Sequence, residues 1–417
     1  MGDKELTVAV VGGGAAGFFG AIAAATANPQ ARVTLYEAGP QPLAKVRISG
    51  GGRCNVTHHC FDPAQLVHSY PRGGKALRGA FSRFQPKDTV EWFSKRGVQL
   101  KTEADGRMFP VTDDSGTIVN CLSRAAERAG VQIKVRSPIT RVEKETDTFT
   151  LTLKSGSNLR CDRLLLTSGS SPIGHRIAQS LGHQLAPPVP SLFTFNVADK
   201  RLHQLSGVAV DPVNVRLKIE GASKKELNPL VQTGPLLVTH WGLSGPAVLK
   251  LSAWGARLLH GQKYRASLMV NLLPSLSQEQ VRSELQQVKA DNGKKAIATY
   301  SPYANISKRL WQYLLDRIEI DLLLTWANLS KKQLNRLVQE LTCGSYEIVG
   351  KGAFKDEFVT CGGVRLKEVN FKTMESRQCA GLYLAGEILD IDGITGGFNF
   401  QSAWTTGWLA GQAIAQC

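Results

Sequence analysis

Several patterns that are common in membrane and metal-dependent proteins are missing from this sequence of 417 residues. No apolar stretch reaches the length of about 18 residues that spans a bilayer, so we expect no membrane-spanning helix. The eight cysteines form no Cys-x-x-Cys pair and the eight histidines no His-Glu-x-x-His motif, which argues against a zinc site. His58-His59-Cys60 is the single local cluster of metal-ligand type, and no second ligand group follows it at a fixed spacing. We expect no bound metal.

A signal peptide is missing as well. The N-terminus leads into an apolar run directly after residue 5 and leaves no room for a leader. We therefore expect a cytoplasmic protein whose cysteines stay reduced.

Negative charge is scarce relative to positive charge, because 50 lysines and arginines stand against 34 aspartates and glutamates. The formal net charge is +16, yet no basic run is longer than two residues, as in Lys224-Lys225. Such an even distribution favours a generally basic surface, although nucleic acid, an anionic membrane or an anionic ligand would fit the sign. We expect a small-molecule substrate, keep RNA binding as an alternative, and find no indication of the oligomeric state.

The strongest motif lies near the N-terminus. The apolar run 8–11 predicts a buried parallel strand, and it ends in Gly12-x-Gly14-x-x-Gly17 at the start of an alanine-rich helix. Gly12 permits the tight turn, Gly14 lets a pyrophosphate approach the backbone, and Gly17 lets helix and strand pack closely. A second strand, 33–36, delivers Glu37, whose carboxylate can accept hydrogen bonds from ribose hydroxyls. The motif predicts a dinucleotide site, and at this point FAD and NAD both fit.

A glycine-rich segment follows, in which Gly50-Gly51-Gly52 precedes Arg53 and Cys54. Three consecutive glycines are typical of a backbone nest for an anion, although a flexible loop would have the same composition. A guanidinium beside such a nest favours contact with a pyrophosphate.

Changes of periodicity divide the rest of the chain. Segments 140–142, 148–153 and 160–166 predict a three-stranded antiparallel meander that leads to a small-residue turn at Ser168 and Gly169. A proline cluster at 187–190 marks a boundary. The predicted domains are a first part of the nucleotide-binding domain (1–190), an insert domain (191–352, β-rich over 191–272 and helical over 273–345, with one helix expected at 319–327), and a second part (353–417).

The C-terminal segment and one loop of the insert add further candidates. A strand at 382–385 ends in Gly386-Glu387, and a carboxylate there can bind ribityl hydroxyls. Gly397 comes shortly before the last helix, whose N-terminus can stabilise negative charge on a reduced flavin. Within the insert, the loop 238–246 contains His240, our candidate for the acid or base of a hydride transfer, although the segment also fits a simple helix cap.

Taken with Ile48-Ser49-Gly50-Gly51-Gly52-Arg53-Cys54-Asn55 and the segment 385–401, these motifs resemble the bacterial FAD-binding flavoproteins grouped as the BaiN-like, or aminoacetone oxidase, family. The resemblance covers nearly the whole chain. It implies an α/β fold: a Rossmann-like FAD-binding domain of the glutathione-reductase type with a three-stranded β-meander, interrupted by an insert domain of mixed β-barrel and helices. The predicted FAD-binding residues are Gly12, Gly14, Ala15, Ala16, Gly17, Glu37, Ala38, Arg53, Cys54, Asn55, Val56, Ile139, Ser168, Gly169, Gly386, Glu387, Asp392, Gly397, Phe398 and Asn399.

Three functions follow as hypotheses. The first is an FAD-dependent oxidoreductase that transfers a hydride between a small organic substrate, or NAD(P)H, and FAD. Because no second strand–Gly-x-Gly-x-x-Gly–helix unit exists, NAD(P)H would dock only transiently. The second is a dithiol–flavin reductase that uses Cys54 and Cys60, and the third is an FAD-containing RNA-binding or RNA-modifying protein.

Overall fold

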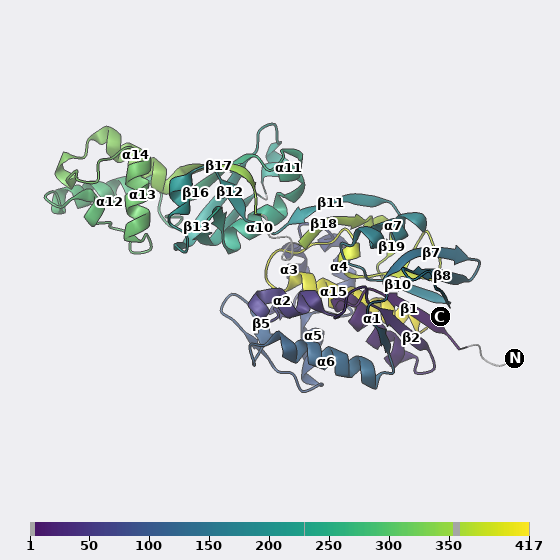
Figure 1. Ribbon diagram of the computed structural model, residues 1–417. Coiled ribbons are helices and arrows are strands. Elements are labelled where there is room, and N and C mark those ends of the chain that lie inside the picture. Colours follow the sequence, from purple (N-terminus) through teal and green to yellow (C-terminus); the bar gives the residue numbers. More distant parts are fainter. Residues whose placement is uncertain (1–4, 229, 353–358, 417) are drawn as a thin grey trace. The chain divides into compact units, whose positions relative to one another are not determined.

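A computed structural model describes residues 5–228, 230–352 and 359–416. The chain divides into two compact units, one formed by 1–189 together with 359–417 and the other by 190–358 (Figure 1). Each unit has its own hydrophobic core. In the described part of the chain, no helix combines the length and the apolar character that a membrane crossing requires.

The first unit is built on a seven-stranded sheet with the order β19-β20-β21-β10-β1-β2-β6, in which β21, β10, β1, β2 and β6 run parallel. Its strands are β1 (Thr7–Val11), β2 (Arg32–Tyr36), β6 (Gln132–Lys134), β10 (Arg163–Leu166), β19 (Val369–Asn370), β20 (Glu375–Ser376) and β21 (Leu382–Leu384). Val11 pairs with Tyr36 on one side and with Leu166 on the other. The chain segments that follow β1, β2 and β10 therefore leave the sheet at one edge, which is where ligands bind in such folds.

Two long helices of this unit pack so closely that side chains do not fit between them at two glycines. A Cβ atom on Gly407 would lie 2.5 Å from the carbonyl oxygen of Ala16, and one on Gly411 would lie 2.4 Å from that of Gly20. Both contacts advance by four residues, so α1 (Ala15–Ala27) and α15 (Phe398–Ile414) run in the same direction. The other helices are α2 (Ala44–Gly52), α3 (Pro63–Leu66), α4 (Gly74–Phe81), α5 (Pro86–Ser94), α6 (Ser115–Arg128) and α7 (Pro172–Ser180).

Smaller sheets complete the first unit. They are the meander β7 (Ile139–Glu145), β8 (Thr148–Leu153), β9 (Asn158–Cys161), the sheet β3 (Thr57–His58), β5 (Arg107–Pro110), β4 (Leu100–Thr102), and the pair β11 (Leu185–Ser191), β18 (Val359–Val364). The single strand predicted over 160–166 is wrong, because the chain leaves the meander at Asp162 and enters the main sheet as β10. The Asp162 carboxylate accepts hydrogen bonds from the N–H of Thr7 at 2.9 Å and from its hydroxyl at 2.6 Å, which fixes this break to the start of β1.

The second unit contains a closed antiparallel barrel with the strand order β12-β15-β14-β13-β16-β17. The strands are β12 (Phe195–Val197), β13 (Ala209–Lys218), β14 (Val231–Val238), β15 (Gly242–Ser244), β16 (Ala266–Asn271) and β17 (Gly344–Lys351). Along β13, Val213, Val215 and Leu217 are buried while Arg216 and Lys218 are exposed, as expected for a filled barrel. The fold class predicted from the sequence is confirmed.

Helices cover and extend the barrel. They are α8 (Lys200–His203), α9 (Lys224–Leu227), α10 (Pro246–Trp254), α11 (Ala256–Gly261), α12 (Gln278–Asp291), α13 (Lys308–Arg317) and α14 (Lys331–Cys343). The helix predicted over 319–327 is wrong. Glu319 has a φ of 59°, which ends α13, and the segment forms only the 3-10 turn η3 (Trp326–Asn328) around a fully buried tryptophan.

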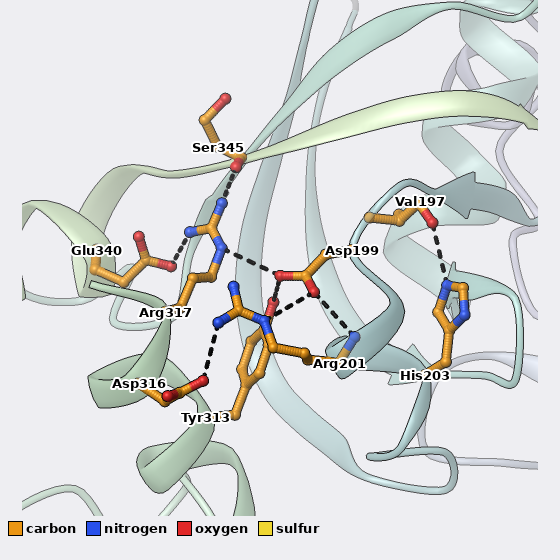
Figure 2. Close-up of polar contacts among 9 residues, drawn as sticks. All are labelled: Val197, Asp199, Arg201, His203, Tyr313, Asp316, Arg317, Glu340 and Ser345. Atoms are coloured by element: carbon orange, nitrogen blue, oxygen red, sulfur yellow. Dashed lines mark hydrogen bonds and ion pairs between the residues drawn. The ribbon is translucent and has the colours of Figure 1, made fainter. Parts of the chain in front are cut away.

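A charged network joins these helices to the barrel (Figure 2). Arg317 of α13 pairs with Glu340 of α14 and donates to the carbonyl oxygen of Ser345, while its Nε lies 3.8 Å from Asp199. Tyr313 donates its hydroxyl to Asp199 at 3.0 Å. Burial raises the pKa of Glu340 although Arg317 opposes the shift. These contacts connect α13, α14 and the segment after β12.

Candidate functional site

The glycines after β1 have different surroundings. Gly12 has a φ of 115°, and a Cβ atom there would lie 2.4 Å from the carbonyl oxygen of Thr167. A Cβ atom on Gly17 would lie 2.0 Å from the carbonyl oxygen of Gly12, whereas one on Gly14 would meet nothing within 4 Å. Gly12 and Gly17 are therefore required by packing, and Gly14 faces open space where a ligand can approach the backbone.

The start of α1 presents free backbone donors to this space. Gly14 is the N-cap and supplies no side-chain cap, and the first turn, which contains Ala15 and Ala16, has no acidic residue. The first N–H groups of a helix lack partners within the helix and carry partial positive charge. The arrangement fits a pyrophosphate.

Glu37 follows β2 and is fixed by two backbone donors. Its Oε2 accepts the N–H of Gly13 at 2.8 Å and its Oε1 accepts the N–H of Gly39 at 2.6 Å, with Ala38 between. Each carboxylate oxygen keeps a further lone pair for a ribose hydroxyl. Gly13 was not among the predicted site residues, and a Cβ atom there would lie 2.9 Å from Glu37 Oε2. The unbroken Gly12-Gly13-Gly14 run was the available signal.

The glycine-rich segment forms the end of α2 and turns away from helical geometry. Gly50, Gly51 and Gly52 all have positive φ, from 58° to 84°, and Cβ atoms on the last two would meet nothing within 4 Å. Cys54 is fully buried. Burial raises the pKa of its thiol to about 12, although a hydrogen bond from Ser49 opposes this shift. A buried neutral thiol is a poor nucleophile, which weighs against a dithiol–flavin mechanism.

The side chain of Arg53 packs against the β3-β5-β4 sheet. Its guanidinium pairs with Glu103 at 2.7 Å and lies 4.0 Å from the centre of the Phe109 ring. The Glu103 hydrogen bond raises the pKa of Arg53, so the side chain stays charged.

Residues 55–57 hold the N-terminus of α15. With its amide oriented to satisfy both groups, Asn55 accepts the N–H of Gly397 at 3.0 Å and donates to the carbonyl oxygen of Thr57 at 3.1 Å. The carbonyl oxygen of Val56 accepts the indole N–H of Trp404 at 2.9 Å. Gly397 supplies no side-chain cap, and the first turn of α15 has no acidic residue. A second uncapped helix N-terminus therefore belongs to the site.

Asp392 and Asn399 shape the loop that precedes α15. Asp392 is fully buried and forms an ion pair with Arg72, whose Nε lies 2.5 Å from Oδ1. The side chain of Asn399 accepts the N–H of Gly393 at 2.8 Å and donates to its carbonyl oxygen at 2.9 Å.

Phe398 opens α15 and stacks on His58, with ring centres 4.5 Å apart. The His58 Nδ1 lies 3.0 Å from the carbonyl oxygen of Gly396, and the Tyr70 hydroxyl donates to that of Phe398 at 2.7 Å. His58, which stood out in the sequence only as part of a cluster of metal-ligand type, is thus a packing partner of the α15 N-terminus.

Glu387 lies at the end of β21, directly after Gly386. Its Oε1 accepts the N–H of Thr360 at 2.8 Å and its Oε2 accepts from Lys45 Nζ at 2.6 Å. A Cβ atom on Gly169 would lie 3.6 Å from that Oε2, so the turns after β10 and β21 meet. Lys45 was not predicted, because its partner lies 342 residues away in the sequence.

Three predicted residues remain. Ser168 precedes Gly169, and its Oγ is buried without a partner among the described residues. Ile139 is buried and opens β7 opposite Leu153. His240 lies in the second unit, on the exposed loop between β14 and β15.

An open glycine turn, a carboxylate after β2 and two uncapped helix N-termini define a dinucleotide-binding protein of the Rossmann type. The sequence matches the family model described as HI0933-like protein Rossmann domain over residues 6–413. The chain belongs to this family, and the predicted resemblance is confirmed. The protein is an FAD-dependent oxidoreductase of this family.

Relatives align with nearly the whole chain. A ribosomal RNA dihydrouridine synthase of Escherichia coli (strain K12) is 31% identical, with 97% of each chain aligned. A 3-dehydro-bile acid delta(4,6)-reductase of Clostridium scindens is 29% identical over 98% of this chain and 99% of the relative. The solved 3-ketosteroid-delta4-(5alpha)-dehydrogenase from Rhodococcus jostii RHA1 shares the fold, with a TM-score of 0.51, 13% identity, and 99% of this chain and 97% of that one covered.

Proposed function

We propose that this oxidoreductase reduces a carbon–carbon double bond that is conjugated to a carbonyl group. One observation carries the proposal: two relatives, each aligned over at least 97% of this chain, are named for reductions of this kind in unrelated substrates. Dihydrouridine differs from uridine by two hydrogens across a ring bond conjugated to a carbonyl. The other name specifies reduction at positions 4 and 6 of a 3-keto compound. The two named reactions share the reduction of a carbon–carbon double bond conjugated to a carbonyl group.

FAD, when bound and reduced, supplies the hydride for the carbon remote from the carbonyl. The chain must then donate a proton to the neighbouring carbon. We assign this proton to His240, which lies on a short, ordered loop. Thr239 donates its N–H to the carbonyl oxygen of Gly242 at 2.8 Å, and Val197 donates to that of Trp241 at 3.1 Å. These contacts hold the backbone of the loop, and the His240 side chain is exposed.

The electron donor in this proposal is NADH or NADPH, docking transiently. Support comes from the single dinucleotide motif of the sequence, which is needed for FAD. We also propose a cytoplasmic location, as expected from the sequence.

A second candidate places the reducible ring within RNA. The net charge of +16 and the name of the 31% identical relative favour it. Binding of a ribosomal RNA fragment should then weaken steeply as salt rises, because phosphate neutralisation releases counterions. If no binding occurs even at low salt, the RNA candidate fails and small conjugated ketones remain.

Product analysis tests the reaction type. The holoenzyme is incubated anaerobically with NADPH or NADH and with either uridine-containing RNA or a conjugated cyclic ketone. The expected product is heavier by two hydrogen atoms, and His240→Ala should slow its formation by about 100-fold. Trp241→Phe, at the adjacent position of the same loop, serves as the control and should leave the rate nearly unchanged. Equal rates in His240→Ala and the wild type would remove His240 from the reaction.

A further inference from the structure

An accessible lysine is tied to the edge of the sheet at which the cofactor binds. Lys45 lies in the first turn of α2, and its Nζ donates to Glu387 Oε2 at 2.6 Å. The lysine side chain is 56% exposed and that of the glutamate 21%. An ammonium group has three donors, so the donors that Glu387 does not take are within reach of a ligand that enters from solvent.

The two segments joined by this ion pair both contact the turn after β1. On the side of α2, Leu43 donates its N–H to the carbonyl oxygen of Gly13 at 2.8 Å. On the side of β21, a Cβ atom on Gly386 would lie 2.8 Å from the Cβ of Ala16. Between these two contacts lies Gly14, where a Cβ atom would meet nothing within 4 Å. The ion pair therefore connects the chain on either side of the open start of α1.

The charges at this turn require a cation. The pyrophosphate of a dinucleotide carries two negative charges, whereas a helix N-terminus supplies roughly half a positive charge. Glu387 adds a carboxylate nearby, since a Cβ atom on Gly169, in the turn after β10, would lie 3.6 Å from its Oε2. A carboxylate without a cationic partner would repel the pyrophosphate. Lys45 neutralises this carboxylate and still has donors for a phosphate oxygen.

The arginine of the same glycine-rich segment has other partners. Arg53, which the sequence predicts as a pyrophosphate ligand, has its Nη1 2.7 Å from Glu103 and 3.6 Å from Asp113. These carboxylates follow β4 and β5, and the guanidinium lies over the ring of Phe109. The charge of Arg53 is thus balanced by two acids, whereas Lys45 shares its single positive charge with one.

We propose that Lys45 is a further binding residue for the pyrophosphate of FAD. Its ammonium group bridges the carboxylate of Glu387 and a phosphate oxygen, so that one cation serves both anions. Lys45 contributes charge and a hydrogen bond to cofactor binding and takes no part in the reduction itself.

The matched control is Lys95, at the end of α5. Its Nζ pairs with Glu91 at the same distance of 2.6 Å, and its side chain is 69% exposed. The two residues are four positions apart on one helix, outside the segments that contact the glycine turn. Lys95→Met therefore removes the same charge and the same kind of ion pair as Lys45→Met. A general effect of lowering the net charge would appear in both variants.

The experiment compares the wild type with Lys45→Met, Lys45→Arg and Lys95→Met. Each apoprotein is titrated calorimetrically with FAD and with ADP, which carries the pyrophosphate without the flavin, and its stability is measured by urea unfolding. Lys45→Met should raise the Kd for both ligands about tenfold, the effect of one lost hydrogen bond to a charged group. Lys45→Arg keeps the charge and should recover most of the affinity.

The dependence on salt adds a readout that a purely structural role would not change. The Kd for FAD should rise with salt in the wild type and rise less steeply in Lys45→Met, because salt screens an exposed cation. Apoprotein stability should be nearly equal in all four proteins. An unchanged Kd for FAD in Lys45→Met, or an equal rise in Lys95→Met, would overturn the assignment. A rise for FAD without one for ADP would place Lys45 at the flavin and would also overturn it. Because the readout is affinity, the result does not depend on the proposed reaction.

Discussion

The Cα of Gly17 faces the carbonyl oxygen of Gly12 so closely that a Cβ atom would lie 2.0 Å from it. Helix α1 can approach β1 only because this position has no side chain. Gly14, three residues earlier, faces open space. One motif thus contains a glycine required by packing and another that is left free for the cofactor.

We predict that two alanine substitutions affect different properties, one the stability of the apoprotein and the other its affinity for FAD. Gly17→Ala should destabilise the apoprotein by about 3 kcal/mol, because the backbone itself must move. Gly14→Ala should change apoprotein stability by less than about 1 kcal/mol, since the space is open and the φ of −87° suits alanine. It should raise the Kd for FAD at least tenfold. Urea unfolding and flavin titration measure the two quantities, and equal stability losses in both variants would contradict the packing argument.

Glu37 gives a second prediction. Glu37→Gln keeps one acceptor oxygen but replaces the other with a donor amide, which faces the N–H of Gly13 or Gly39 instead of accepting from it. We expect the Kd for FAD to rise about tenfold, the value of one hydrogen bond to a charged group. Glu143→Gln, at an exposed ion pair of the meander, is the control and should have no effect. Unaltered affinity in Glu37→Gln would argue against the adenosine half of FAD lying at Gly13.

The thiol of Cys54 leads to a third prediction. Because burial raises its pKa to about 12, Cys54 should resist alkylation in the native protein at neutral pH. Cys60, which is partly exposed, should react before Cys54, and Cys60→Ser should retain turnover. Mass spectrometry after alkylation identifies the labelled residue. Loss of turnover in Cys60→Ser would restore the dithiol–flavin hypothesis.

The charged network of the second unit predicts that the stability of the folded protein decreases at acid pH. Burial disfavours the charged form of Asp199, but hydrogen bonds from Tyr313 and Arg201 outweigh this and lower its pKa. The unfolded pKa of an aspartate is about 3.9, so the stabilisation is fully present above that pH and is lost as the pH falls through the lower folded value. Urea unfolding followed below about pH 4 should show this loss.

Asp199→Asn isolates the contribution of this carboxylate. The variant should be less stable at neutral pH, and its remaining stability should fall less steeply in acid than that of the wild type. Asp316→Asn removes an exposed carboxylate that pairs with the same Arg201 and should behave like the wild type. Identical acid profiles for all three proteins would exclude Asp199 as the source.

The parts of the fold that could be predicted are local in sequence. The run from β1 through Gly12 and α1 to Glu37 carries its own periodicity and glycine spacing, so strand, turn and helix were evident. The division between β9 and β10 was missed, because Asp162 lies within an otherwise strand-like segment and its partner is Thr7. The helix over 319–327 was wrongly predicted, because a left-handed Glu319 has no sequence signature.

The same distinction applies to the site. Gly14, Glu37 and Gly397 follow from motifs, and their geometry fits FAD. Lys45 acquires its position only through Glu387, which lies 342 residues away in the sequence, so this contact depends on the folded geometry.

Anaerobic flavin reoxidation tests the central claim most directly. The bound FAD is photoreduced and mixed with a conjugated cyclic ketone or uridine-containing RNA, and the visible flavin absorbance is followed. At least one of these compounds should restore the oxidised spectrum, while its saturated counterpart should not. If the reduced flavin is reoxidised by oxygen but by none of the conjugated compounds, reduction of a conjugated double bond is not the activity of this protein.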